Sequence, residues 1–528
     1  MRNDKLVNIL QQRSSGILLP VFSLPGSWGI GDLGDAARAF IDFLGRAGQS
    51  AWQILPLGPT SPVFGDSPYM SFSTFAGNPL FISPEMLVRQ GLLQDGDLEA
   101  EAFSEYAVDY PRVTAAKTRL LRAAWAVFRV RLDAAATLAV FCADHPWAAG
   151  HGLFLALKDR FDGAPWYQWP EPLRHRQETA LAEARTQLAD EIDYFVFEQY
   201  LFFDQWHRLR AYARDSGIAL IGDLPIYVAL DSVDVWNNQE IFQLDPASGE
   251  PTRVAGVPPD YFSANGQRWG NPLYRWNTRS ARIRDRLWDW WAERLRLNFE
   301  LVDVLRIDHF RGFEAYWAVP AAEETAINGT WQPGPGQPFF AEMERRLGGM
   351  AIIAEDLGVI TPEVERLRLN LGYPGMKILL FAFDGSPDNS YLPFNCEPDS
   401  VVYTGTHDND TAVGWYLSPQ VDPAFKRRAK RFANRDDDDP STFHRDLVHL
   451  ALGSPANLAL LPLQDVLGFG NDCRLNTPGT PTGNWQWRCA ARFLTDETAA
   501  WLRDLSTLFG RIPPTPQPKP VPHEDPAH

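Results

Sequence analysis

The sequence predicts an α/β protein: a (β/α)8 TIM barrel with inserted helical and loop subdomains and no C-terminal β-sandwich domain. Short apolar runs alternate with amphipathic helical patterns, which is typical of a parallel sheet covered on both faces. Eight such runs occur, and that number favours a closed barrel over an open sheet. The runs are residues 17–19, 52–55, 218–228, 301–310, 351–358, 376–383, 401–408 and 458–465.

Residues 1–57 are predicted to supply the first barrel strands. Between their two apolar runs, Ala37, Phe40, Ile41 and Leu44 follow the spacing of one face of a helix. The pattern strand, helix, strand is a βαβ unit, the repeating element of a parallel barrel.

Two long segments interrupt the strand–helix alternation. Residues 58–217 exceed any single connection, and the helical patterns at 118–132 and 178–213 predict an inserted, mainly helical subdomain. Barrel strand 3 follows at 218–228. Residues 229–282 are rich in Pro, Gly, Asn and aromatic residues, so we predict an inserted loop region at the active site.

The remainder of the barrel is assigned to residues 283–511. Within it, Thr361 can cap a helix that has Pro362 in its first turn and ends at Gly372. The Pro-rich stretch 512–528 is predicted to be a disordered tail.

The composition describes a soluble globular protein of 528 residues with a net charge of −17. Binding to nucleic acid or to an anionic membrane is not expected, because it requires clustered Lys and Arg. The chain has no signal-peptide pattern and no apolar run near the ~20 residues of a membrane span. Four cysteines without a CxxC pair favour the cytoplasm. The 19 tryptophans slightly favour a ligand such as a sugar ring.

Four of the predicted strands end in a carboxylate, namely Asp223, Asp308, Glu355 and Asp408. The active site of a (β/α)8 barrel lies at the C-terminal ends of its strands, so these side chains are expected to converge. Two carboxyl groups ~5–5.5 Å apart can cleave a glycosidic bond with retention of configuration.

Alternation along a strand places Arg306 and Asp308 on the same face. The guanidinium can keep the carboxylate ionised, as a nucleophile requires, but the two residues could equally form a structural ion pair. Glu355 has no basic neighbour in sequence, so burial can raise its pKa to suit a general acid. His309 could be a core histidine.

The other strand ends also have structural interpretations. Asp223 could cap the following loop, and Glu355 with Asp356 could mark the start of a helix. His407 and Asp408 could bind a metal, but none of the ten histidines has HxH or HExxH spacing, so a zinc hydrolase fits poorly.

Taken together, these motifs resemble the amylomaltases, which are the 4-α-glucanotransferases or disproportionating enzymes of glycoside hydrolase family 77 in the α-amylase clan. The resemblance runs from about Arg13 to Arg511. Ten stretches carry it in the order of the family: GILLPVFSLPGSWGIGDLG, WQILPLGPTSP, DSPYMSFSTFAGNPLFIS, GDLPIYVALDSVDVW, GVPPDYFSANGQRWGNPLY, LRIDHFRGF, AEDLG, GYPGMKIL, GTHDNDT and NTPGTPTGNWQWR.

The resemblance implies a role for each strand-end residue. Asp308 would be the nucleophile and Glu355 the acid/base. Asp408 would hold hydroxyls of the sugar in subsite −1, and His407 would bond to the same sugar. Arg306 would orient Asp308 and keep it charged.

Further residues are implied to bind glucan. Asp223 matches the first conserved region of the clan, although the NH dipeptide that often closes that region in α-amylases is absent here. Tyr69 resembles a residue that contacts the donor glucan. Tyr261, Phe262 and Trp269 are candidate walls of the acceptor side, although aromatic residues in such a loop can also serve only to pack it.

The implied reaction transfers α-1,4-glucan segments to the 4-hydroxyl of an acceptor glucan or of glucose by retaining double displacement. It requires neither cofactor nor metal. The sequence does not decide whether the protein binds a structural Ca²⁺. The expected partners are α-1,4-glucans and maltooligosaccharides, bound by a monomer or small homo-oligomer. The alternatives are an α-glucan hydrolase and a non-catalytic glucan-binding protein.

Overall fold

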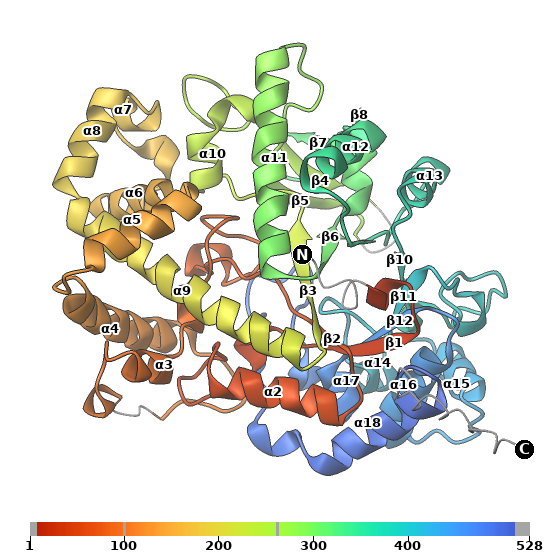
Figure 1. The fold of residues 1–528 in the computed structure, drawn as a ribbon. Coiled ribbons are helices and arrows are strands. Elements are labelled where there is room, and N and C mark those ends of the chain that lie inside the picture. Colours follow the sequence, from red (N-terminus) through yellow and green to blue (C-terminus); the bar gives the residue numbers. More distant parts are fainter. Residues whose placement is uncertain (1–7, 99–101, 260–262, 513–528) are drawn as a thin grey trace, which may run out of the picture.

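The computed structural model describes residues 8–98, 102–259 and 263–512. Figure 1 shows a central barrel with a large group of helices on one side of it. No helix in these three ranges is both long enough and apolar enough to cross a membrane.

Eight parallel strands form a closed barrel in the order β1-β12-β11-β10-β9-β6-β3-β2. The predicted barrel is therefore confirmed, and each strand lies within or beside one of the eight apolar runs. The strands are β1 (Ser14–Leu18), β2 (Ala51–Gln53), β3 (Ala219–Pro225), β6 (Val304–Asp308), β9 (Ile352–Ala354), β10 (Gly375–Ile378), β11 (Ser400–Tyr403) and β12 (Leu458–Pro462).

Helices cover the outside of the barrel, as the alternating pattern predicted. Thr361 is the residue that precedes the helix beginning at Pro362, and Gly372 ends that helix with a left-handed backbone (φ 68°) that suits glycine. The helices are α2 (Asp35–Arg46), α11 (Ala281–Leu301), α12 (Gly336–Leu347), α13 (Pro362–Leu371), α14 (Ala412–Leu417), α15 (Pro423–Phe432), α16 (Phe443–Gly453), α17 (Leu463–Leu467) and α18 (Asp496–Leu508).

The segment between β2 and β3 is helical and, in its described residues, contains no strand. It forms the group on the left of Figure 1. The long helix α9 packs against α6 within this group and against α2 on the barrel, so it joins the two parts. The helices are α3 (Pro84–Arg89), α4 (Tyr110–Phe128), α5 (Ala134–Asp144), α6 (Trp147–Arg160), α7 (Glu171–Arg174), α8 (Glu178–Gln187) and α9 (Ala189–Asp215).

The loop interpretation of residues 229–282 is incomplete, because this segment holds α10 (Val233–Asn237) and two strands, β4 (Arg253–Val257) and β5 (Gln267–Pro272). They join β7 (Ala315–Pro320) and β8 (Thr330–Pro333) in an antiparallel sheet of order β5-β4-β7-β8. The sequence pattern missed this sheet because Gly and Pro interrupt its strands and because β4 pairs with β7, some sixty positions later in the chain.

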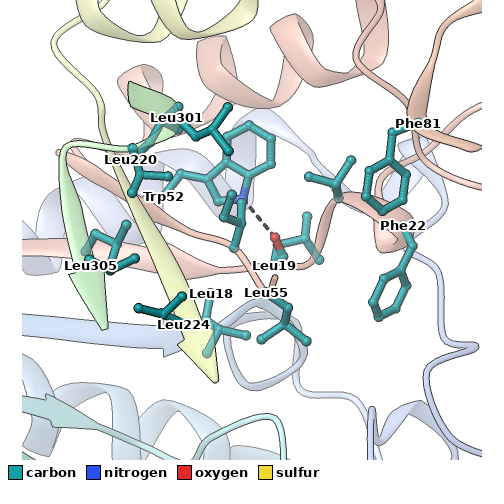
Figure 2. Close-up of a cluster of buried hydrophobic side chains, with 14 of the residues drawn as sticks. Leu18, Leu19, Phe22, Trp52, Leu55, Phe81, Leu220, Leu224, Leu301 and Leu305 are labelled. Carbon is teal, nitrogen blue, oxygen red and sulfur yellow. Dashed lines mark hydrogen bonds between the residues drawn. The ribbon is translucent and has the colours of Figure 1, made fainter. Parts of the chain in front are cut away.

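Figure 2 shows part of the core, where leucines of the barrel strands surround Trp52 on β2. The Trp52 side chain is fully buried, and its indole Nε1–H donates a hydrogen bond to the Leu19 carbonyl oxygen at 2.8 Å. The neighbours drawn from the two strands that pair with β2 include Leu18 on β1 and Leu220 on β3. A residue this large cannot be removed without leaving a cavity.

Trp52→Ala is expected to lower the free energy of unfolding by about 3–5 kcal/mol, because it leaves a cavity and an unpaired carbonyl at Leu19. Urea denaturation followed by circular dichroism measures this loss. Val63→Ala, at a side chain that is 69 % exposed, is the control and should change stability by less than about 0.5 kcal/mol. A loss at Trp52 no larger than the control's would contradict the proposed packing.

Candidate active site

The strand register brings together the charged residues at the C-terminal ends of β3 and β6. Asp223 pairs with Arg306, and Pro225 pairs with Asp308. Arg306 Nη1 donates hydrogen bonds to both carboxylate oxygens of Asp223, at 2.6 and 2.7 Å. Its Nη2 lies 3.0 Å from Asp308 Oδ1. One guanidinium therefore holds two carboxylates, as the shared strand face predicted for Asp308.

Exposure distinguishes the two carboxylates that Arg306 binds. The Asp223 side chain is fully buried, whereas that of Asp308 is 32 % exposed. A fully buried carboxylate is stable only while it stays paired with a cation or hydrogen-bond donors. A partly exposed carboxylate at a strand end can instead contact a ligand. Asp223 is therefore placed to orient Arg306, and Asp308 is the accessible carboxylate of the pair.

Tyr69 completes the environment of Asp223 from the segment that follows β2. Its phenol donates a hydrogen bond to Asp223 Oδ2 at 2.8 Å and lies 3.4 Å from His407 Nδ1. Its ring stacks on that of His407, with centroids 5.1 Å apart. Burial and the Asp223 charge raise the pKa of Tyr69 well above its usual value, so the phenol stays protonated and continues to donate.

Glu355 follows β9, and its carboxylate is held by backbone groups. Oε2 accepts the N–H of His309 at 2.7 Å, and Oε1 accepts the N–H of Leu357 at 2.9 Å. Because His309 directly follows Asp308 in the chain, the Glu355 carboxyl lies beside the end of β6. Burial, followed by the Asp308 charge, raises the pKa of Glu355 to about 7. The raised pKa expected for this residue is present.

Asp356 plays a different part from its neighbour. It accepts the N–H of Met376 at 2.7 Å and lies 3.1 Å from Arg368 Nε. It therefore fixes the end of β9 to β10 and α13. The helix-start interpretation does not describe either residue, because α13 begins at Pro362, several positions later.

Asp408 and His407 lie in the loop after β11. The Asp408 carboxylate is 3.4 Å from His407 Nε2 and accepts a hydrogen bond from Asn476 Nδ2 at 2.6 Å. Desolvation opposes ionisation here, but the imidazole and the Asn476 amide together hold the pKa of Asp408 well below its usual range. Burial would lower the pKa of His407, yet Asp408 raises it overall. The two residues form a coupled pair at the barrel mouth.

His309 has an uncommon backbone conformation for a residue with a side chain (φ 52°). This turn directs its N–H at Glu355, and strain of this kind tends to occur at functional sites. Burial lowers the pKa of the imidazole to about 4, so the ring is neutral. Trp269 on β5 meets the ring edge to face at 4.8 Å. Through Trp269, the small sheet thus reaches the residue that directly follows Asp308.

The structure brings eight of the ten predicted site residues into this one region. The other two, Tyr261 and Phe262, lie outside the described residues. The sequence analysis missed Asn476, which bonds to Asp408, and Trp485, whose ring lies 5.7 Å from that of Tyr69. Both belong to the NTPGTPTGNWQWR stretch, whose resemblance to the family does not by itself indicate which of its residues contact the site.

The described residues contain no group of three or more His, Cys, Asp and Glu side chains placed to hold a metal ion. The partners of the two carboxylates at the ends of β6 and β9 are instead a guanidinium and backbone amides. A proton donor with a pKa near neutrality beside a carboxylate paired with arginine is suited to general acid and nucleophilic catalysis.

Comparison with known proteins agrees with this geometry. The family model described as 4-alpha-glucanotransferase (glycoside hydrolase family 77) matches residues 19–495. The chain belongs to the 4-alpha-glucanotransferase family. Among curated 4-alpha-glucanotransferases, that of Synechocystis is 48 % identical over 511 residues, covering 95 % of this chain and 99 % of its own. That of Thermus thermophilus is 46 % identical, with the same coverage.

A solved 4-alpha-glucanotransferase structure also superimposes closely. The amylomaltase of Streptococcus agalactiae, in complex with acarbose, matches with a TM-score of 0.90 and 38 % identity, covering 95 % of this chain and 100 % of its own. The predicted resemblance is confirmed. The hydrolase and the non-catalytic binding protein are not favoured, because the relatives at this identity are named as transferases.

Tyr69→Phe in this 4-alpha-glucanotransferase is expected to lower kcat/KM about 10- to 100-fold, because it removes a hydrogen bond to a charged group worth about 1.5–3 kcal/mol. Tyr212→Phe is a matched control, since it removes a hydroxyl that bonds to Asp42 on the surface. Initial rates with maltotriose measure both variants. Equal rates for the two would show that the Tyr69–Asp223 bond does not order the site.

Proposed function

We propose that the protein transfers α-1,4-glucan segments from a donor to the 4-hydroxyl of an acceptor glucan or of glucose, with retention at the anomeric carbon. One observation carries the proposal: Glu355, with a pKa raised to about 7, accepts the N–H of the residue that follows the arginine-paired Asp308. Two neighbouring carboxyl groups in different environments can divide the roles of acid and nucleophile.

In the first step, Glu355 gives its proton to the glycosidic oxygen as Asp308 Oδ attacks the anomeric carbon. The bond from that carbon to the glycosidic oxygen breaks, and the reducing-end fragment leaves with the proton. A covalent glycosyl ester on Asp308 results. Arg306 keeps the attacking carboxylate oriented through its 3.0 Å contact.

In the second step, the Glu355 carboxylate accepts the proton of the acceptor 4-hydroxyl. The hydroxyl oxygen attacks the anomeric carbon, and the ester bond to Asp308 breaks. Two inversions give net retention, and Glu355 is again protonated. Burial raises the pKa of Glu355 to about 7. A pKa near neutrality favours this cycle, because the same group must give and accept a proton near neutral pH.

The other site residues are assigned to the sugar that carries the reacting carbon. Asp408, whose pKa is held low, can accept hydrogen bonds from sugar hydroxyls, and His407 can donate to the same sugar. Asp223 holds Arg306, and Tyr69 bonds to Asp223 and stacks on His407. These assignments are supported by contacts at the barrel mouth.

Transfer requires that an acceptor sugar reach the ester in place of water. Trp269, set against His309 by the small antiparallel sheet, is the candidate acceptor wall in the described residues. The transferase names of the relatives and the acarbose complex of the streptococcal enzyme support an α-glucan as substrate.

Incubation with maltotriose alone, followed by chromatography, tests the proposal. A ladder of longer maltooligosaccharides together with glucose, at a constant number of reducing ends, is the expected result. Shorter sugars only, with reducing ends rising in step, would establish a hydrolase and reject the acceptor role of Trp269. Cleavage of neither kind would reject the whole assignment.

We also assign the protein to the cytoplasm. All four cysteines are free thiols, and two of them, Cys396 and Cys489, are buried. Unpaired thiols without any disulfide are usual in a reducing compartment. The two-step transfer uses no cofactor.

A further inference from the structure

The loop that carries His407 and Asp408 joins the end of β11 to the start of α14, and we call these residues, 404–411, the Asp408 loop. Inside it, Asn409 Oδ1 accepts hydrogen bonds from the N–H and the hydroxyl of Thr406, at 2.8 and 2.9 Å. The Thr406 hydroxyl oxygen accepts the N–H of Asp408 at 3.3 Å. These bonds shape the middle of the loop, so other contacts must fix its position on the barrel.

One carboxylate, that of Asp465, binds both ends of the Asp408 loop. Its Oδ2 accepts the hydroxyl of Thr404, the first residue after β11. Its Oδ1 accepts the N–H of Ala412, the first residue of α14, at 2.7 Å. Asp465 lies on α17, which directly follows β12, and β12 pairs with β11. Figure 1 shows α14 and α17 next to each other below β12.

Packing alone does not explain a carboxylate at this position. Asp465 is 1 % exposed, and in the described parts of the chain it forms no ion pair. Burial raises its pKa to about 6, and the hydrogen bonds from Ala412 and Thr404 lower the pKa only in part. Burying a charge without a cation is costly, and an aliphatic side chain would fill the space without that cost. What the carboxylate adds is the pair of hydrogen bonds.

Asp465 can influence a sugar only through the Asp408 loop. Its own side chain is buried, whereas that of Asp408 is partly exposed at the barrel mouth. The segment that follows α17 holds the same loop at its middle: Arg474 Nη2 donates to the Asp408 carbonyl oxygen at 2.6 Å, and Asn476 bonds to the Asp408 carboxylate. Residues 465–476 therefore support the Asp408 loop at both ends and at its centre.

We infer that Asp465 is a positioning residue for glucan transfer, which sets the place of Asp408 by binding Thr404 and Ala412. The inference rests on the function proposed above, in which Asp408 binds hydroxyls of the sugar that carries the reacting carbon. A displacement of about 1 Å in such a group can cost about 10²-fold in rate. Loss of both hydrogen bonds should therefore appear in kcat.

Three substitutions test the two hydrogen bonds, with α-maltotriosyl fluoride as donor and acceptor. Asp465→Ala removes both and is expected to lower kcat about 10²-fold, with KM changed less than about threefold. Asp465→Asn can still accept from Ala412 and donate to Thr404 Oγ1, so its kcat should stay within about threefold of the parent's. An asparagine variant as slow as the alanine variant would overturn the inference.

Thr404→Val provides a milder change if Asp465→Ala does not fold. Valine has nearly the shape of threonine but lacks the hydroxyl, so the bond from Ala412 to Asp465 remains. The expected loss in kcat is about 3- to 10-fold, the value of one hydrogen bond to a charged group. A kcat equal to the parent's would contradict the role given to the Thr404–Asp465 bond.

Coupling to Asp408 separates positioning from general stability. On an Asp408→Asn background, Asp465→Ala should cost less than about threefold, because the carboxylate that it positions is already absent. Asp446→Ala is the matched control, since Asp446 is a buried carboxylate on α16 that pairs with Lys430 and Arg435. Any loss that the control causes should be the same on both backgrounds. Equal losses for Asp465→Ala on the two backgrounds would overturn the inference.

The choice of donor distinguishes this inference from the proposed function. Asp465→Ala should lose the same factor with maltotriose as with the fluoride, because Asp408 is assigned to the sugar ring and not to the leaving group. A loss confined to maltotriose would place Asp465 in the proton-transfer step and overturn its positioning role. Parent-like rates for Asp408→Asn, with normal transfer by the parent protein, would overturn this inference alone. A parent protein that transfers from neither donor would overturn both.

Discussion

Asp308→Asn is expected to lower kcat for glucan transfer by about four to six orders of magnitude, the loss that follows removal of a covalent nucleophile. The amide is nearly the same size as the carboxylate, but it cannot form the glycosyl ester. Arg306 still binds Asp223 through two hydrogen bonds, so the fold should survive. Affinity for maltooligosaccharides is expected to change by less than about tenfold, because that binding also uses other residues.

A small anion identifies the nucleophile directly. In Asp308→Gly, azide can occupy the vacated space and attack an α-maltotriosyl fluoride from the face opposite the leaving group. The expected product is the inverted β-glycosyl azide, with rates rising with azide concentration. Asp303→Asn, next to β6 but bound to Arg210, is the control and should retain transfer. An α-azide product from Asp308→Gly would assign the nucleophile elsewhere.

Glu355→Gln is expected to lower kcat by about 10²- to 10⁴-fold with unactivated glucans, the usual contribution of a general acid. The loss should be much smaller with glycosyl fluorides, because fluoride leaves without a proton. Asp356→Asn is the matched control: it alters the adjacent buried carboxylate, which bonds to Met376 and Arg368, and is expected to affect stability more than the leaving-group dependence.

The pH dependence of catalysis by the parent protein is expected to follow the ionisation of Glu355. Glu355 must be protonated to act as an acid, and its pKa is raised to about 7, so the first step should slow as the pH rises above about 7. The alkaline limb of kcat/KM for maltotriose measures this, and Glu355→Gln should lose that limb. A limb that persists unchanged in the variant would mean that another group controls it.

Stability provides an independent check on Glu355. Because its folded pKa lies above its unfolded value, the folded state binds the extra proton, and stability declines as pH rises from about 4.5 through about 7. Glutamine cannot ionise, so Glu355→Gln should melt at a higher temperature than the parent at pH 8 and at a similar temperature at pH 4. A lower melting temperature at pH 8 would contradict the burial of this charge.

The barrel strands and the position of Asp308 could be predicted from the sequence because both depend on local periodicity. A stretch such as Val302 to Ile307, whose four aliphatic side chains are buried, indicates a strand, and the carboxylate that follows it lies at the C-terminal edge. The helix that begins at Pro362 was accessible for the same reason, since its start and its terminating glycine lie within a few residues of each other.

The small sheet beside the active site could be recognised only from the tertiary structure. Strand β4 pairs with β7, some sixty positions later in the chain, and neither strand has a long apolar pattern. Trp269 reaches His309 only because this pairing forms. Asn476 reaches Asp408 from a loop whose composition gives no sign of its position.

The sequence by itself determined the barrel, the four carboxylates at its strand ends and, through its motifs, the family. Only the tertiary structure decided which carboxylate is accessible, that one Arg306 is shared by Asp223 and Asp308, and that Glu355 is buried enough for its pKa to reach about 7. The physical reason is that periodicity is a local property of the chain. Burial and charge proximity, which set protonation and reactivity, arise only between residues that folding brings together.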